Sequence, residues 1–161
     1  MKSSLINVLI FATLGAAAIG VGGAMFIKEN KKAENVFELR DAHAEKVIGV
    51  DLKDTYPGFT TTYTLKLLSG NGAAQTKIAL TDIEEGGLEK YLIFECKHED
   101  VSLFKDTVSN LKGYVFDKKL TYGSQDELQF VYTFDEDAPN ESINTYTRFS
   151  ISVSVDKEEG K

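Results

Sequence analysis

The chain has 161 residues, of which 42% are hydrophobic, 27% charged and 11% aromatic. This composition is typical of a folded domain and excludes a chain that is disordered throughout. Residues 1–32 hold four lysines and one glutamate, which leaves 14 basic and 24 acidic side chains in the rest of the chain. Because an acidic surface repels phosphate, we predict no nucleic-acid partner. The single cysteine, Cys96, excludes an intramolecular disulfide.

Residues 5–27 contain no charged side chain. A helix of that length matches a hydrocarbon layer of about 30 Å, so we predict an N-terminal hydrophobic helix within residues 1–27, acting as a signal peptide or a transmembrane anchor. The small residues Gly22-Gly23-Ala24 are what a signal peptidase requires, which predicts cleavage after Ala24. Cleavage is the preferred interpretation and a retained anchor is the alternative. Both predict an exported protein, extracellular or on the cell surface.

Beyond a linker at residues 28–45, apolar and polar residues alternate with a period of two in segments 48–52, 59–67, 74–80, 128–135 and 148–156. Turn residues stand between several of them, at 56–58, 69–72 and 84–87. One dry face and one wet face are typical of antiparallel sheets packed face to face. We predict a mostly-β, immunoglobulin-like antiparallel sandwich of about seven or eight strands over residues 46–157, followed by a disordered tail at 158–161. The predicted core includes Tyr63, Leu65, Phe130, Tyr132, Phe149, Ile151 and Val153.

One segment departs from the period of two. Val101, Phe104, Val108 and Leu111 are spaced three, four and three residues apart, as on one face of a helix, and Gly113 follows as a stop signal. This spacing predicts one short helix that crosses between the sheets.

The sequence contains few side chains in patterns that indicate catalysis or metal binding. The two histidines, His43 and His98, form no His-Glu-x-x-His pair. Cys96 and His98 share one face of a strand, yet a buried core cysteine is favoured over half of a metal site. The acidic residues 135–137 favour a solvated turn over a calcium site, because no spaced calcium-binding pattern accompanies them. We therefore predict no catalytic, cofactor-binding or metal-ligating residue, and no cofactor.

The order of the segments along the chain is similar to that of a known protein family. The small-residue stretch 22–24 precedes Asn35-Val36-Phe37, a Tyr-Pro-Gly turn at 56–58, a strand and small helix within 88–111, and the run FDEDAPNE at 134–141 before the strand 149–155. This order resembles the TasA/camelysin-like exported bacterial proteins and their archaeal bundling-pilus relatives. The resemblance implies a jelly-roll sandwich that, in some members, polymerises into extracellular fibres by donating an N-terminal strand to the next subunit.

The preferred function is a non-catalytic fibre or biofilm-matrix subunit whose partner is a second copy of itself. The candidate donor strand lies within 33–40 and includes Val36, Phe37 and Leu39, although a strand that completes its own sheet is an equal alternative. The second function is a monomeric surface or adhesion module that binds other cell-surface proteins and is held in the membrane by residues 5–27. A camelysin-type metalloprotease is the least favoured, because no metal ligand can be carried over from the resemblance.

Overall fold

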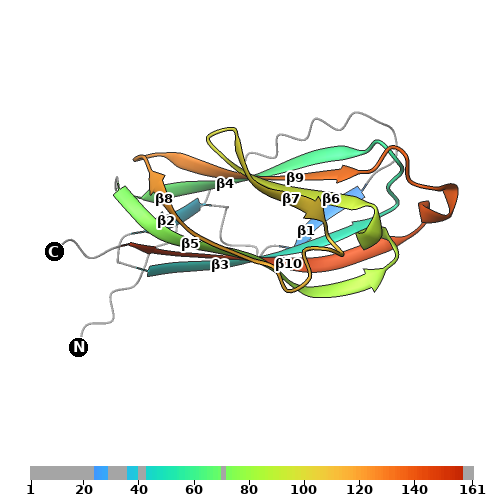
Figure 1. Ribbon diagram of the computed structural model, residues 1–161, viewed down its shortest axis with the longest axis horizontal. Helices are drawn as coiled ribbons and strands as arrows, with labels where there is room; N and C mark the ends of the chain where they lie inside the picture. Colours follow the sequence, from blue (N-terminus) through green and yellow to red (C-terminus); the bar gives the residue numbers. More distant parts are fainter. Residues whose placement is uncertain (1–23, 29–35, 40–42, 70–71, 158–161) are drawn as a thin grey trace.

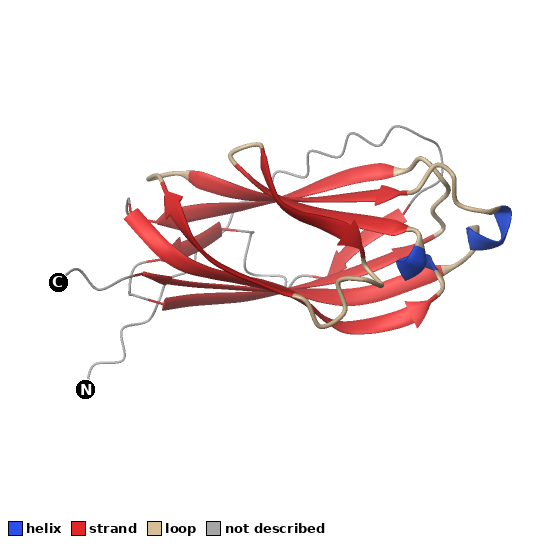
Figure 2. Ribbon diagram, in the orientation of Figure 1, coloured by secondary structure: helices blue, strands red, loops and turns tan. Residues whose placement is uncertain are grey.

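The computed structural model describes residues 24–28, 36–39, 43–69 and 72–157. The fold is mostly β, with two sheets that pack face to face (Figure 1). Among the described residues, helix is limited to two single 3₁₀ turns at one end of the molecule, η1 (Leu88–Lys90) and η2 (Asn140–Ser142) (Figure 2). The β-sandwich that the alternating pattern predicts is therefore confirmed at the level of two packed sheets.

Each sheet has four long antiparallel strands and one short strand at an edge. The first sheet contains, in spatial order, β1 (Ala24–Lys28), β3 (His43–Lys53), β10 (Tyr146–Lys157), β5 (Gly72–Gly86) and β8 (Val115–Tyr122). The second contains β2 (Val36–Leu39), β4 (Thr60–Ser69), β9 (Asp126–Phe134), β6 (Leu92–His98) and β7 (Val101–Thr107). The pairing of β2 with β4 is parallel, and the other ladders are antiparallel.

The core forms because every second residue of a strand points into the space between the two sheets. All seven residues predicted for the core lie buried there. Phe94 of β6 stands at its centre, with ring centroids 5.8 Å from Phe130, 5.5 Å from Tyr132 and 6.2 Å from Phe149. Because Phe149 belongs to β10 of the opposite sheet, these ring contacts hold the two sheets together.

The helix predicted from the spacing of residues 101–111 is wrong, because residues 101–107 form the edge strand β7. A β-bulge explains the error. Cys96 pairs with Phe104 and Lys97 pairs with Ser102, so Leu103 is an extra residue in β7. Leu103 and Phe104 both pack partly buried against the core, which breaks the period of two and imitates helical spacing.

The predicted break at 84–87 falls late in β5, which runs on to Gly86. A side chain at Gly86 would meet the main-chain oxygen of Tyr146 at 2.3 Å, so this close approach of β5 and β10 requires glycine. Gly87 follows with a φ of +103° and begins the turn into η1. The chain therefore changes sheets at this glycine pair.

Most of the predicted hydrophobic helix, residues 1–23, and the tail at 158–161 lie outside the described residues. The last residues of that segment, 24–27, are not helical as predicted: Ala24, after which cleavage is predicted, opens β1, which pairs with β3 from Ala24–Lys53 to Lys28–Gly49. Within the described ranges, no helix is long and apolar enough to cross a membrane.

Candidate functional site

At one edge of each sheet, the short strand leaves a long stretch of its neighbour without a further described strand beside it. In the first sheet, β1 pairs with Gly49–Lys53, so residues 43–48 of β3 have no strand on that side among the described residues. In the second sheet, β2 pairs with Lys66–Ser69, so residues 60–65 of β4 are likewise uncovered. An edge of a sheet that is not covered by a further strand is a template for an added strand.

The uncovered part of β4 differs from the other edges in charge. Its residues read TTTYTL and include no charged side chain, and Thr60 and Thr62 are half-buried on the outer face of the sheet. The other edges carry charged residues: Glu45 and Lys46 on β3, Lys105 and Asp106 on β7, and Asp117, Lys118 and Lys119 on β8. Charged edge residues oppose strand addition, so the β4 edge is the one that favours it.

The candidate donor residues Val36, Phe37 and Leu39 lie in β2, on this same edge of β4. Their pairing is parallel, from Val36–Lys66 to Leu39–Ser69. β2 covers four residues of a ten-residue strand. The segment that the sequence predicts as a donor and the edge best suited to accept a strand are therefore adjacent in one chain.

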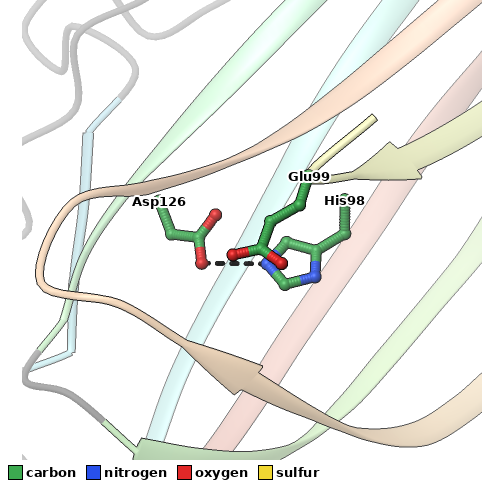
Figure 3. A group of neighbouring side chains, drawn as sticks. All are labelled: His98, Glu99 and Asp126. Atoms are coloured by element: carbon green, nitrogen blue, oxygen red, sulfur yellow. Dashed lines mark hydrogen bonds and ion pairs between the residues drawn. The ribbon is translucent and has the colours of Figure 1, made fainter. Parts of the chain in front are cut away.

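A cluster of polar side chains, two of them largely buried, lies at the end of the second sheet (Figure 3). The Nε2 atom of His98 lies 2.9 Å from Oδ2 of Asp126, and the two side chains are 9% and 5% exposed. The pair forms because Leu128 is opposite His98 in the ladder of β6 and β9, and Asp126, two residues from Leu128, lies diagonally from His98 on the same face.

Backbone groups hold the Asp126 carboxylate in place. The N–H of Gly123 donates to Oδ2 at 3.1 Å, and the N–H of Glu127 donates to Oδ1 at 2.8 Å. The carboxylate of Glu99 completes the cluster, because Glu99 and Asp100 form a two-residue turn between β6 and β7 with φ values of +48° and +62°. One ligand atom from each of His98, Glu99 and Asp126 can be chosen so that all lie within 4.8 Å of one another.

The cluster is linked to the first sheet through two further side chains. The ring of Tyr122 lies edge-on to His98, with centroids 5.1 Å apart. The Tyr122 hydroxyl is 2.7 Å from the hydroxyl of Thr76 in β5. Burial raises the pKa of Tyr122, so this hydroxyl stays protonated and able to donate. The polar network thus spans both sheets at one end of the core.

Cys96 is fully buried in the core, and burial, assisted by the nearby Glu95, raises the pKa of its thiol. It does not belong to the cluster that contains His98. His43 lies elsewhere, on β3, where its Nδ1 contacts the Asp156 carboxylate on β10. Asp135 turns its carboxylate onto the N–H of Asp137 at 3.0 Å, as in an Asx turn.

Local spacing did not reveal the partners of His98. Asp126 is 28 residues away in the sequence, and the turn conformation of Glu99 depends on the hairpin. The alternation of side chains along the strand gives one usable signal. Asp126 stands two residues before Leu128 in the buried series Leu128, Phe130 and Tyr132, so it lies on the same face of the strand.

No known protein family matches the chain, and no curated protein does. Among solved structures, the chain is similar to the C-terminal CBM6 of LamC, a marine laminarinase from Zobellia galactanivorans. The identity is 7%, the TM-score is 0.36, and the match covers 89% of this chain and 97% of that one. A similarity of this degree carries no inference about function.

Proposed function

We propose that the chain is an exported, non-catalytic structural subunit that assembles by strand addition, with the β4 edge as acceptor and a segment containing Val36, Phe37 and Leu39 as donor. The observation that carries this proposal is the uncharged stretch Thr60–Leu65, which has no further strand beside it among the described residues. Main-chain hydrogen bonds to an added strand would supply affinity, and the alternating side chains of that strand would supply specificity.

The position of β2 supports an exchange between copies. In one chain, β2 occupies only the end of the β4 edge that lies at Lys66–Ser69. A donor from a second copy would add further main-chain hydrogen bonds by extending along Thr60–Leu65. Because each copy has one donor and one acceptor, passing the donor on from copy to copy generates a filament, whereas reciprocal exchange between two copies would close a dimer. We propose the first arrangement.

The proposal fits the resemblance to TasA/camelysin-like proteins and a jelly-roll arrangement of the sandwich. In that reading, export with cleavage after Ala24 would leave Met25 as the first residue. The donor segment would then begin at Val36, eleven residues after Met25, and would have to leave its own β4 to reach a neighbouring molecule.

Complementary variants test the donor and acceptor separately. Thr62→Lys places a charge on the acceptor edge, and Phe37→Asp places one in the donor. Each variant alone is expected to stay monomeric in sedimentation velocity, with an unchanged circular dichroism spectrum. An equimolar mixture is expected to form heterodimers, because one variant retains its donor and the other its acceptor.

Val47→Lys is the matched control, because it places the same charge on the uncovered part of β3, where Val47 is 56% exposed. This variant is expected to form the same filaments as the native chain in electron microscopy. The proposal fails if Thr62→Lys assembles like the native chain, or if the mixed variants remain monomeric.

The uncharged segment 5–27 favours a second proposal, in which the helix is retained and the sandwich is a monomeric surface module anchored in the membrane. Mass spectrometry of the N-terminus from the native host separates the two. An N-terminus at Met25 indicates release, whereas an N-terminus at Met1 indicates anchoring.

A further inference from the structure

The cluster of His98, Glu99 and Asp126 has the composition of a transition-metal site. An imidazole nitrogen with two carboxylate oxygens is a ligand set that suits Zn²⁺ and its neighbours, whereas Ca²⁺ and Mg²⁺ prefer oxygen ligands alone. The residues come from two elements, the β6–β7 hairpin and the first residue of β9. Their convergence depends on tertiary structure and is not a local run of acidic residues.

The distances fit an ion between the side chains. Bonds of about 2.0–2.2 Å around Zn²⁺ hold neighbouring ligand atoms roughly 3.0–3.5 Å apart. His98 Nε2 and Asp126 Oδ2 are already 2.9 Å apart, and the carboxylate of Glu99 completes a group within 4.8 Å. The two buried ligand atoms therefore need to move apart only slightly, with the imidazole turned so that its lone pair points at the ion and no longer at the carboxylate. The third is an exposed side chain that can approach by rotating its own torsions.

The surroundings fix the two buried ligands in advance. The N–H groups of Gly123 and Glu127 orient the Asp126 carboxylate, in the way that outer hydrogen bonds orient metal ligands in known sites. The ring of Tyr122 packs edge-on against His98 and restricts the imidazole plane. Because these side chains are ordered by the fold, little conformational entropy is lost when an ion binds.

Charge also favours a cation at this position. The carboxylates of Glu99 and Asp126 lie close together beside a buried imidazole. Two carboxylates at this separation repel each other, and a divalent ion between them removes that repulsion. It would also tie the β6–β7 turn to the start of β9 and close this end of the sandwich.

We propose that His98 Nε2 and the carboxylates of Glu99 and Asp126 bind a divalent transition-metal ion such as Zn²⁺. The three ligands share no residue with the β4 stretch Thr60–Leu65 proposed for assembly, so either proposal can fail without the other. Binding requires neutral imidazole, whose Nε2 lone pair replaces the contact with Asp126 by a bond to the ion.

The test is isothermal titration of the full chain, in mild detergent and treated with chelator, with Zn²⁺ alone. We expect one ion per chain, together with a change in the ¹⁵N shift of the His98 ring nitrogen. Glu99→Gln is the most informative variant, because Glu99 is exposed and its loss leaves the core unchanged. It is expected to weaken Zn²⁺ affinity by about tenfold or more, and His98→Gln to weaken it further.

His43→Gln is the matched control, because the only other histidine also faces an aspartate but stands in the exposed pair with Asp156. This variant is expected to keep the native affinity, and Ca²⁺ is expected not to compete with Zn²⁺. The proposal is overturned if no Zn²⁺ binds, if Glu99→Gln binds as tightly as the native chain, if His43→Gln weakens binding as much as His98→Gln, or if Ca²⁺ displaces Zn²⁺.

Discussion

The two histidine–aspartate pairs of this chain allow a direct test of how burial sets the contribution of a polar contact. His98 and Asp126 are 9% and 5% exposed, whereas His43 and Asp156 are 55% and 45% exposed. Asp126→Ala removes the partner of a buried imidazole and leaves the N–H groups of Gly123 and Glu127 without their acceptor. Asp156→Ala removes a contact that water can replace.

Three hydrogen bonds are lost in Asp126→Ala, and the His98 imidazole left behind stays largely out of water. Losing three hydrogen bonds to a carboxylate costs about 3–5 kcal/mol, a large part of the roughly 5–15 kcal/mol that stabilises a typical domain. For Asp156→Ala we expect a change within about 0.5 kcal/mol. Asp126→Asn should lie between the two, because the amide oxygen still accepts one hydrogen bond.

Urea unfolding followed by far-ultraviolet circular dichroism measures these differences, in EDTA so that bound metal contributes nothing. We expect the midpoint to fall strongly for Asp126→Ala with an unchanged slope, since a lower midpoint at constant slope reports lost stability. Equal midpoints for the Asp126→Ala and Asp156→Ala variants would refute the reasoning, because burial would then have no effect on the contribution of the contact.

Three further predictions concern the core. Phe94→Ala is expected to lower the free energy of unfolding, measured by urea unfolding, by about 3–5 kcal/mol, and Phe94→Leu by about 1.5 kcal/mol or less. A smaller loss for Phe94→Ala than for Phe94→Leu would contradict the role given to this ring in the core. Tyr132→Phe is expected to stabilise the fold or leave it unchanged in thermal unfolding, because the Tyr132 hydroxyl is buried and has no hydrogen-bond partner among the described residues; a clear fall in Tm would be evidence against this. Stability is expected to fall as the pH rises above about 9, because burial raises the pKa values of Cys96, Tyr122 and Tyr132 and the native state keeps protons that the unfolded chain releases. Urea midpoints measured from about pH 7 to 11 test this, and a midpoint that does not change with pH would contradict it.

The sequence predicts the central strands well where one face of a strand is dry and the other wet. In β10, Phe149, Ile151 and Val153 alternate with serines, and they lie buried as the alternation requires. The signal is strong here because β10 lies inside its sheet, with β3 on one side and β5 on the other, so every second residue faces the core.

The prediction of secondary structure fails at an edge of the second sheet, where a strand has a neighbour on one side only and its register is less tightly fixed. β7 pairs with β6 alone, which leaves room for a bulge with Leu103 as the extra residue, and a bulge destroys the period on which the prediction depends. The alternating pattern also does not predict β8, because Asp117, Lys118 and Lys119 occupy three successive positions in the middle of the strand and interrupt the alternation of apolar and polar residues.

The candidate sites could not be predicted from local sequence, because both are consequences of which strands become neighbours. A run such as TTTYTL indicates a strand, yet only the order β2-β4-β9-β6-β7 makes it an edge strand. Only the shortness of β2 leaves this run without a further strand beside it among the described residues. In the same way, His98 and Asp126 meet because β6 pairs with β9 in one particular register. A slip of one residue would turn Asp126 to the outer face and abolish the cluster. The register that buries Leu128 and Phe130 is therefore also what assembles the proposed metal site, so selection for a packed core would preserve these ligands' positions even without a metal.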